Sequence, residues 1–224
     1  MNIVLPNSTS LQEQLLSLLS DLPWLKLFSA VRRFAGRLLQ GFASEGIYEV
    51  LDYECKLELK DHGGRDATIK KREKIRYLQD YVTTYQDQAW GDGEIFLNYT
   101  CFPGFPVDEY RLGANTFKLI SLRNSRNKGD LDEFNIEWSM RNGFLKSTGF
   151  WSTSINHKTS NARVKLVFPK DRPPLNVSVR ERNLQRTRVL EPESWHTLPD
   201  GRRMILWENA NPRLYEDYIL KWGW

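Results

Sequence analysis

Residues 46–66 read GIYEVLDYECKLELKDHGGRD, and the apolar pattern of the chain changes within this stretch. From Tyr48 to Leu59 apolar side chains alternate with polar ones, with one change of phase between Val50 and Tyr53. Alternation of this kind is typical of a β-strand with one buried face. The paired glycines of DHGGRD suit a hairpin turn. The stretch therefore predicts a strand that turns back into an antiparallel sheet.

The rest of the chain repeats this pattern of short apolar runs separated by turn signals. Asp92-Gly93 and Asp200-Gly201 are typical of turns, as are the clusters RNSRNKGD and PKDRPP. About nine or ten strands are expected, with almost no helical period between them. The pattern predicts a mainly β protein, with an antiparallel domain of β-sandwich or barrel-like form. The runs are ATIKKREKIRYLQDYVTTY (67–85, expected as one long strand), EIFLNYTCF (94–102), TFKLISLR (116–123), FNIEWSM (134–140), GFWSTSI (149–155), ARVKLVFP (162–169), LNVSVRER (175–182) and RRMILW (202–207).

The C-terminal residues 215–224, YEDYILKWGW, also alternate. Tyr218, Leu220, Trp222 and Trp224 share one face if this segment is a strand. One strongly apolar face and one mixed face is what a sheet covered on one side requires. The segment is therefore expected to close the fold with its aromatic side chains buried, rather than to expose a platform for a ligand.

Residues 1–45 differ in kind and predict an amphipathic helical arm ahead of a β domain over 46–224. A capping-box pattern at Ser10 and Glu13 starts a first helix, and Pro23 separates it from a second. The result is a two-helix N-terminal arm.

The second helix of this arm, from Trp24 to about residue 40, is amphipathic. Trp24 and Phe28 lie on its apolar side, and Arg33 and Arg37 on the other. Three roles fit: packing on the β domain or on an identical copy, docking to another protein, and contact with a membrane surface through basic residues.

Composition narrows the functional classes only slightly. The chain has 224 residues, 40% of them hydrophobic, and a net charge of +4, which permits a weak preference for anionic partners. Cys55 and Cys101 are too few for a disulfide framework and are expected to be free thiols. The first residues do not match a signal peptide, so a cytoplasmic location is expected.

Catalytic patterns are weak throughout the sequence. ESWHTLPDGR (193–202) brings Ser194, His196 and Asp200 together in sequence, but no nucleophile-elbow motif accompanies them. His196 is therefore a weak catalytic candidate, and Cys101 is a nucleophile only if a base lies nearby. The three histidines are far apart and there is no phosphate-binding loop, so no metal or cofactor is expected.

A basic bias in the last third is the most suggestive feature. Arg180, Arg182, Arg186 and Arg188 recur at even spacing, which on one strand would place them on one face. Such a row suits an anionic ligand or the phosphates of nucleic acid. The alternative is a solvated face whose arginines pair with acidic neighbours. No aromatic residues are interleaved with these arginines, which disfavours specific nucleic-acid binding.

Together these patterns favour a non-enzymatic interaction or ligand-sensing module, with an effector role for the arm. The β domain is expected to bind a protein partner or an anionic ligand, and the arm to dock, self-associate or touch a membrane. Two alternatives stay open. One is a hydrolase with a site assembled in space around His196 or a pair of carboxylates. The other is a non-specific nucleic-acid binder that uses the arginines between residues 180 and 188.

Overall fold

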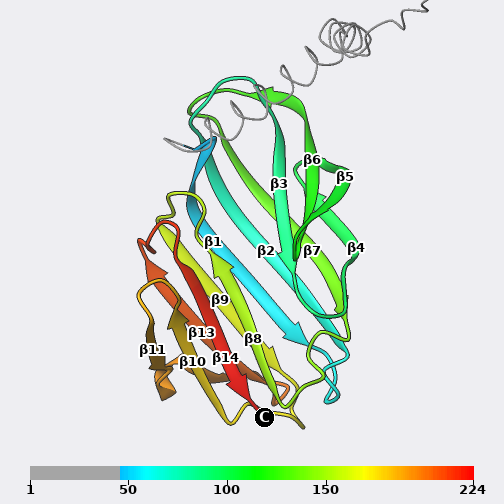
Figure 1. The fold of residues 1–224 in the computed structure, drawn as a ribbon, viewed down its shortest axis with the longest axis vertical. Helices are drawn as coiled ribbons and strands as arrows, with labels where there is room; N and C mark the ends of the chain where they lie inside the picture. Colours follow the sequence, from blue (N-terminus) through cyan, green and yellow to red (C-terminus); the bar gives the residue numbers. More distant parts are fainter. Residues whose placement is uncertain (1–45) are drawn as a thin grey trace, which may run out of the picture. The chain divides into compact units, whose positions relative to one another are not determined.

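The computed structural model describes residues 46–224, and Ile47–Trp224 forms one compact unit. The predicted two-helix arm lies outside the described residues. Within them the only helical element is one 3-10 turn, Pro192–Ser194. The strands, shown in Figure 1, are β1 (Tyr48–Leu59), β2 (Asp66–Tyr77), β3 (Val82–Trp90), β4 (Glu94–Phe102), β5 (Phe105–Leu112), β6 (Asn115–Arg126), β7 (Leu131–Arg141), β8 (Thr148–Ser154), β9 (Asn161–Phe168), β10 (Asn176–Glu181), β11 (Arg186–Val189), β12 (Trp195–Thr197), β13 (Arg203–Ala210) and β14 (Asp217–Gly223).

These strands form three sheets arranged in two layers (Figure 1). A seven-stranded sheet has the order β12-β13-β9-β1-β2-β7-β4. It faces a four-stranded sheet, β11-β10-β14-β8, and a three-stranded sheet, β3-β6-β5. Rings meet across the layers: Tyr85 of β3 stacks on Phe134 of β7 with centroids 4.0 Å apart, and Trp207 of β13 lies 4.9 Å from Tyr218 of β14. The prediction of a mainly β, antiparallel domain is confirmed, with one exception: β1 and β9 pair in parallel.

The hairpin of β1 and β2 forms as the opening stretch predicts. Their antiparallel register shifts between Val50 and Asp52, where the sequence changes phase. In the connecting turn, Gly64 has a φ of +67°, and a Cβ there would come within 2.1 Å of the carbonyl oxygen of Phe144. Only glycine fits this close approach of two backbones.

One predicted strand is wrong. Residues 67–85 do not form a single strand, because β2 ends at Tyr77 and β3 begins at Val82 in the other layer. The reversal is made by residues 78–81, with Tyr81 at a φ of +60°. The N–H of Leu78 donates to the carbonyl oxygen of Ile47 (2.9 Å), which ties this turn to the start of β1. The apolar pattern continues through the turn, so periodicity alone does not reveal it.

The C-terminal segment is a closing strand, as predicted. β14 lies in the interior of its sheet, between β8 and β10. Tyr218, Leu220 and Trp222 are buried, and Trp224 just beyond the strand is partly buried. The Trp222 ring lies 5.4 Å from the Phe168 ring of the opposite layer. The aromatic end of the chain is therefore part of the core.

Within residues 46–224, no helix is long and apolar enough to cross a membrane. Cys55 is buried and Cys101 is partly buried, and both are free cysteines.

Candidate functional site

The four predicted ligand-binding arginines do not form one row. Arg180 pairs with Thr187 across the β10–β11 ladder, whereas Arg188 pairs with Val179 and Arg186 with Glu181. Directly opposed residues share a face. Arg186 and Arg188 therefore lie on the opposite face from Arg180. The prediction of a single face is wrong because residues 182–185 form a hairpin turn that reverses the chain and exchanges the faces.

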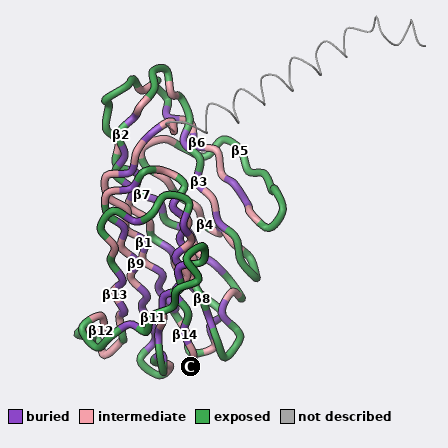
Figure 2. The backbone as a smooth tube through the Cα atoms, turned by 60° about the vertical axis from the view of Figure 1, so that its left-hand side comes forward, coloured by how far each residue is buried: buried purple, intermediate pink, exposed green. Residues whose placement is uncertain are grey.

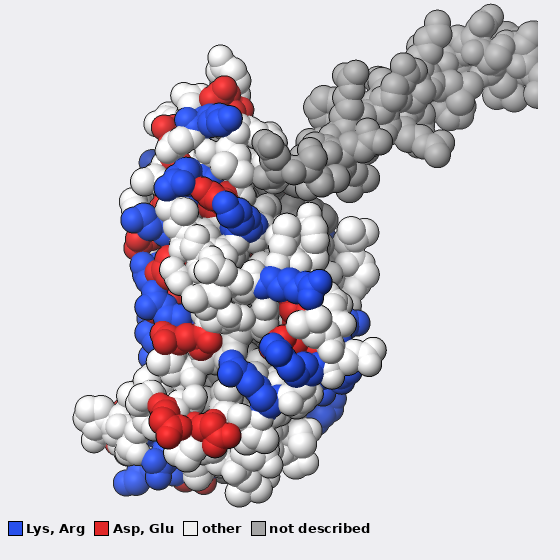
Figure 3. All heavy atoms as spheres, turned by 90° about the vertical axis from the view of Figure 1, so that its left-hand side faces the viewer, with Lys and Arg blue, Asp and Glu red and all other residues white. Residues whose placement is uncertain are grey.

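Two of these arginines already have acidic partners. The guanidinium of Arg186 donates to both carboxylate oxygens of Glu181 (2.8 and 2.9 Å), and Arg182 pairs with Asp217 at 3.1 Å. Arg180 and Arg188 make no ion pair with any described residue. Figure 3 shows a face on which basic and acidic side chains are interspersed rather than gathered into one basic patch. This arrangement fits a solvated, partly neutralised surface better than a phosphate site.

The weak catalytic candidates are not assembled into a site. His196 is exposed on β12, and its side chain makes no hydrogen bond or ion pair within residues 46–224. The Asp200 carboxylate accepts hydrogen bonds from Arg202 instead, from Nε at 2.7 Å and from the backbone N–H at 3.1 Å. Burial raises the pKa of the Cys101 thiol to about 12, so it stays protonated at neutral pH. These observations give no support to a hydrolase site around His196 or Cys101, and the version built on a pair of carboxylates stays a hypothesis.

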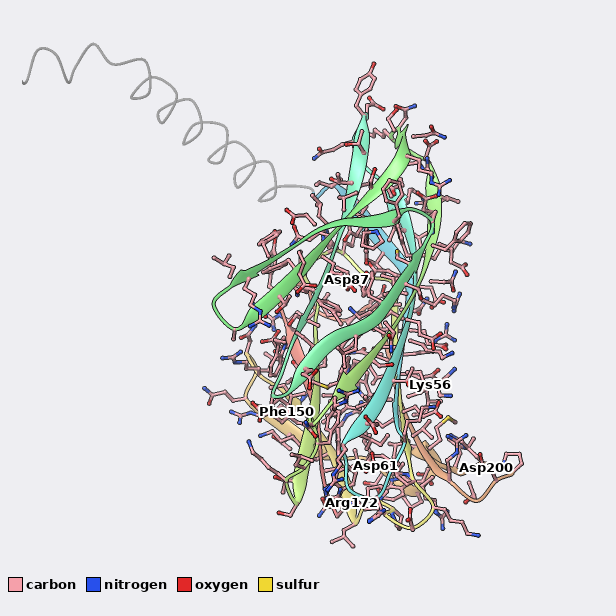
Figure 4. All side chains as sticks on the ribbon, turned by 90° about the vertical axis from the view of Figure 1, so that its right-hand side faces the viewer. Lys56, Asp61, Asp87, Phe150, Arg172 and Asp200 are labelled. Carbon is pink, nitrogen blue, oxygen red and sulfur yellow. The ribbon has the colours of Figure 1, made fainter. Side chains whose placement is uncertain are left out.

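The structure instead reveals a cluster of ionisable side chains inside the domain. Lys71 and Glu73 point inward from β2, Tyr85 and Asp87 from β3, and Tyr99 from β4. We call these five residues the buried polar centre. Asp87, labelled in Figure 4, is 3% exposed and Glu73 is 8% exposed. Charged groups are almost never buried to this extent unless they are paired.

Asp87 is the main acceptor of the buried polar centre. Its carboxylate forms an ion pair with Lys71 and accepts hydrogen bonds from the Tyr99 hydroxyl (3.1 Å) and the Gln88 N–H (2.9 Å). Lys71 also donates to the carbonyl oxygen of Gln88 at 3.2 Å. Burial alone disfavours the charged ammonium of Lys71, but the Asp87 carboxylate outweighs it and raises the pKa of Lys71. The pair therefore holds one positive and one negative charge inside the domain.

Glu73 is held differently from Asp87. Burial raises the pKa of its carboxyl group to about 7, although the Tyr85 hydroxyl, which donates to Oε2 at 3.0 Å, and the Lys71 ammonium partly oppose this. Burial therefore favours the protonated form of Glu73 beside the Lys71–Asp87 ion pair. No group of three or more His, Cys, Asp or Glu residues in the described range is arranged to hold a metal ion.

The variant Glu73→Gln is expected to flatten the pH dependence of stability. The carboxyl group has a reference pKa of 4.5 and a pKa of about 7 when folded, so the folded state binds more protons between these values. Stability of the parent then falls as pH rises through this window, by roughly 3 kcal/mol in all. Urea unfolding should show that the free energy of unfolding of the variant, relative to that of the parent, is higher at pH 8 than at pH 5. Glu133→Gln, on an exposed site, is the control, and an equal difference at both pH values would contradict the assignment.

A second feature lies at the surface, on β5. All eight of its residues are exposed, including Phe105, Val107, Tyr110 and Leu112 (Figure 2). β5 pairs with β6 on one side and is the last strand of its sheet, so its other edge has no neighbouring strand among the described residues. An unpaired edge presents backbone N–H and C=O groups that are free to pair with another chain. We call this feature the β5 edge.

The outward face of the three-stranded sheet is also apolar beside this edge. Register places Trp90, Asn115 and Leu112 in one row across β3, β6 and β5, and Gln88, Phe117 and Tyr110 in the next. The Tyr110 ring stacks on Phe117 with centroids 5.1 Å apart. Leu112 is 69% exposed. We call this surface the outer apolar face, made of Trp90, Tyr110, Leu112, Phe117 and Leu119; of these, Phe117 is only 9% exposed and lies against the Tyr110 ring.

The sequence analysis missed β5 because its alternation is broken. The register shifts between Pro106 and Asp108, and the following residues are mostly charged. A signal was nevertheless present: Gly104 and Gly113 frame the segment, and both have a positive φ in the turns that bound it. A strand framed by two glycine turns and followed by the apolar run of β6 has the form of a hairpin.

No protein-family model matches this chain, and no curated protein is similar to it at a significant level.

Proposed function

We propose that this protein is a non-enzymatic interaction module that binds a protein partner through the β5 edge and the outer apolar face. One observation carries the proposal: β5 is a strand of eight exposed residues that pairs only with β6 among the described strands. A strand normally gains its stability from burying at least one face. Here the side chains of all eight residues stay exposed within residues 46–224.

The chemistry of the β5 edge suits strand addition. A partner strand can hydrogen-bond to the unpaired backbone groups, while side chains on alternate positions contact the two faces. Leu112 and Val107 are 69% and 51% exposed, and Trp90 and Tyr110 extend the apolar surface inward. Exposed apolar groups of this size that are contiguous rather than scattered are typical of protein interaction sites.

Photo-crosslinking in the cells that make this protein tests the proposal. A photoreactive phenylalanine analogue at Leu112 should give a crosslinked product, whereas the same analogue at Leu175, also exposed but before β10, should give none. The product is identified by mass spectrometry and should disappear when Asp108→Pro removes a backbone donor from β5. Absence of any product at position 112, with the folded chain present in normal amount, would contradict the function.

A further inference from the structure

We infer that the partner at the β5 edge is a second copy of this chain, paired antiparallel strand to strand about Tyr110; this inference rests on the proposed function. In a two-fold antiparallel pair centred on Tyr110, Glu109 lies directly opposite Arg111 of the other copy, and the reverse pair forms by symmetry. Asp108 then faces Leu112 of the copy. The two opposite charges therefore match twice in a single interface.

Neighbouring registers are less favourable. Centring the pair on Glu109 places two like charges directly opposite each other, which is destabilising. Centring the pair on Arg111 places two guanidinium groups directly opposite each other, which is destabilising for the same reason. Of these three registers, only the one about Tyr110 avoids repulsion, and it also forms both ion pairs. Charge thus favours this register over its two neighbours.

The charges that this register uses are available. Arg111 is exposed and makes no ion pair with any described residue. Glu109 pairs with Lys118 of its own sheet, yet its side chain remains 45% exposed, so one carboxylate can accept from both cations. Lys118 lies beside the Phe96 and Tyr99 rings, at 5.4 and 5.2 Å from their centroids, which fixes its ammonium under Glu109. Each copy therefore offers a positioned carboxylate and an unpaired guanidinium.

The outer apolar face also continues across this pair. Tyr110 already stacks on Phe117, and a second Tyr110 opposite it would place four rings in one row. The two three-stranded sheets would join into one sheet of six strands, which pairs both β5 edges and leaves a β3 strand at each end. An interface built on a single strand edge is small, so the dimer is expected to be reversible and concentration-dependent.

Sedimentation velocity of the full chain over a range of concentrations tests the inference. The parent should dimerise, and Arg111→Glu and Glu109→Lys alone should each weaken the dimer at least tenfold, because each places like charges in opposition. An equimolar mixture of the two variants should restore a 1:1 heterodimer, since the carboxylate introduced at position 111 of one copy then faces the ammonium introduced at position 109 of the other. Arg188→Glu, on the exposed edge of β11, is the matched control and should dimerise like the parent.

Three results would overturn the inference. They are a monomeric parent at all concentrations, a dimer that the single variants leave unchanged, and variants whose mixture fails to recover. Thermal unfolding of each variant verifies that it is folded. Arg111→Glu should leave the transition nearly unchanged, whereas Glu109→Lys should lower it slightly because the ion pair with Lys118 is lost. If position 112 crosslinks to a different protein and the parent is monomeric, self-association is ruled out, whereas the proposed function still holds.

Discussion

A chain that lacks residues 220–224 is expected not to fold. β14 is an interior strand, hydrogen-bonded to β10 on one side and β8 on the other, so the deletion opens two strand edges at once. It also removes Leu220 and Trp222, which are 0% and 2% exposed. A domain of this size is stable by only about 5–15 kcal/mol, and losing two such side chains consumes most of that margin. Circular dichroism should show loss of the cooperative unfolding transition.

Trp222→Ala gives the same test in graded form. The ring contacts Phe144 and Phe168, with centroids 5.7 and 5.4 Å away, and Gly149 leaves room for it on β8. Removing a buried tryptophan ring is expected to lower the free energy of unfolding by roughly 3–5 kcal/mol. Trp90→Ala, at a site 37% exposed, should cost about 1 kcal/mol. Equal costs in urea unfolding would show that the C-terminal ring is not part of the core.

The strands that the sequence predicts are those with unbroken alternation. β7 and β14 each keep one apolar face over their length, so the residues alone indicate which side is buried. The predictions are wrong where the backbone changes direction but the pattern of residue types along the sequence does not change. The turn before Val82 carries apolar residues on both sides, and the turn after Arg182 keeps the arginine spacing even while it reverses the chain. Hydrophobic periodicity indicates which residues share a face of a strand, but it does not indicate where the chain reverses.

The buried polar centre shows a different limit. Lys71 and Glu73 alternate with the same phase as Ile69 and Ile75, so the period indicates an inward position for both. The run KKREK, however, is rich in charged residues, which suggests a solvated strand. The acidic residue that pairs with Lys71 when it is buried lies on another strand. Asp87 is brought to Lys71 by the crossing between the two layers. That contact depends on topology, which one sequence does not specify.

Lys71→Met is expected to cost far more stability than its neighbour Lys70→Met. Lys71 is the cation of a pair whose side chains are 10% and 3% exposed, and its removal leaves Asp87 ionised inside the domain with only two neutral donors. Breaking a buried ion pair from one side costs roughly 3–5 kcal/mol. Lys70 points outward and pairs with Glu137 at the surface, where both side chains are about half exposed. Its replacement should cost about 0–1 kcal/mol.

The double variant Lys71→Met/Asp87→Asn separates pairing from packing. Asparagine keeps an acceptor oxygen for the Tyr99 hydroxyl but carries no charge, so the double variant should recover at least half of the stability that Lys71→Met loses. Urea unfolding of both single variants and the double variant measures this recovery. If the double variant loses as much stability as Lys71→Met and Asp87→Asn lose together, the two charges do not depend on each other.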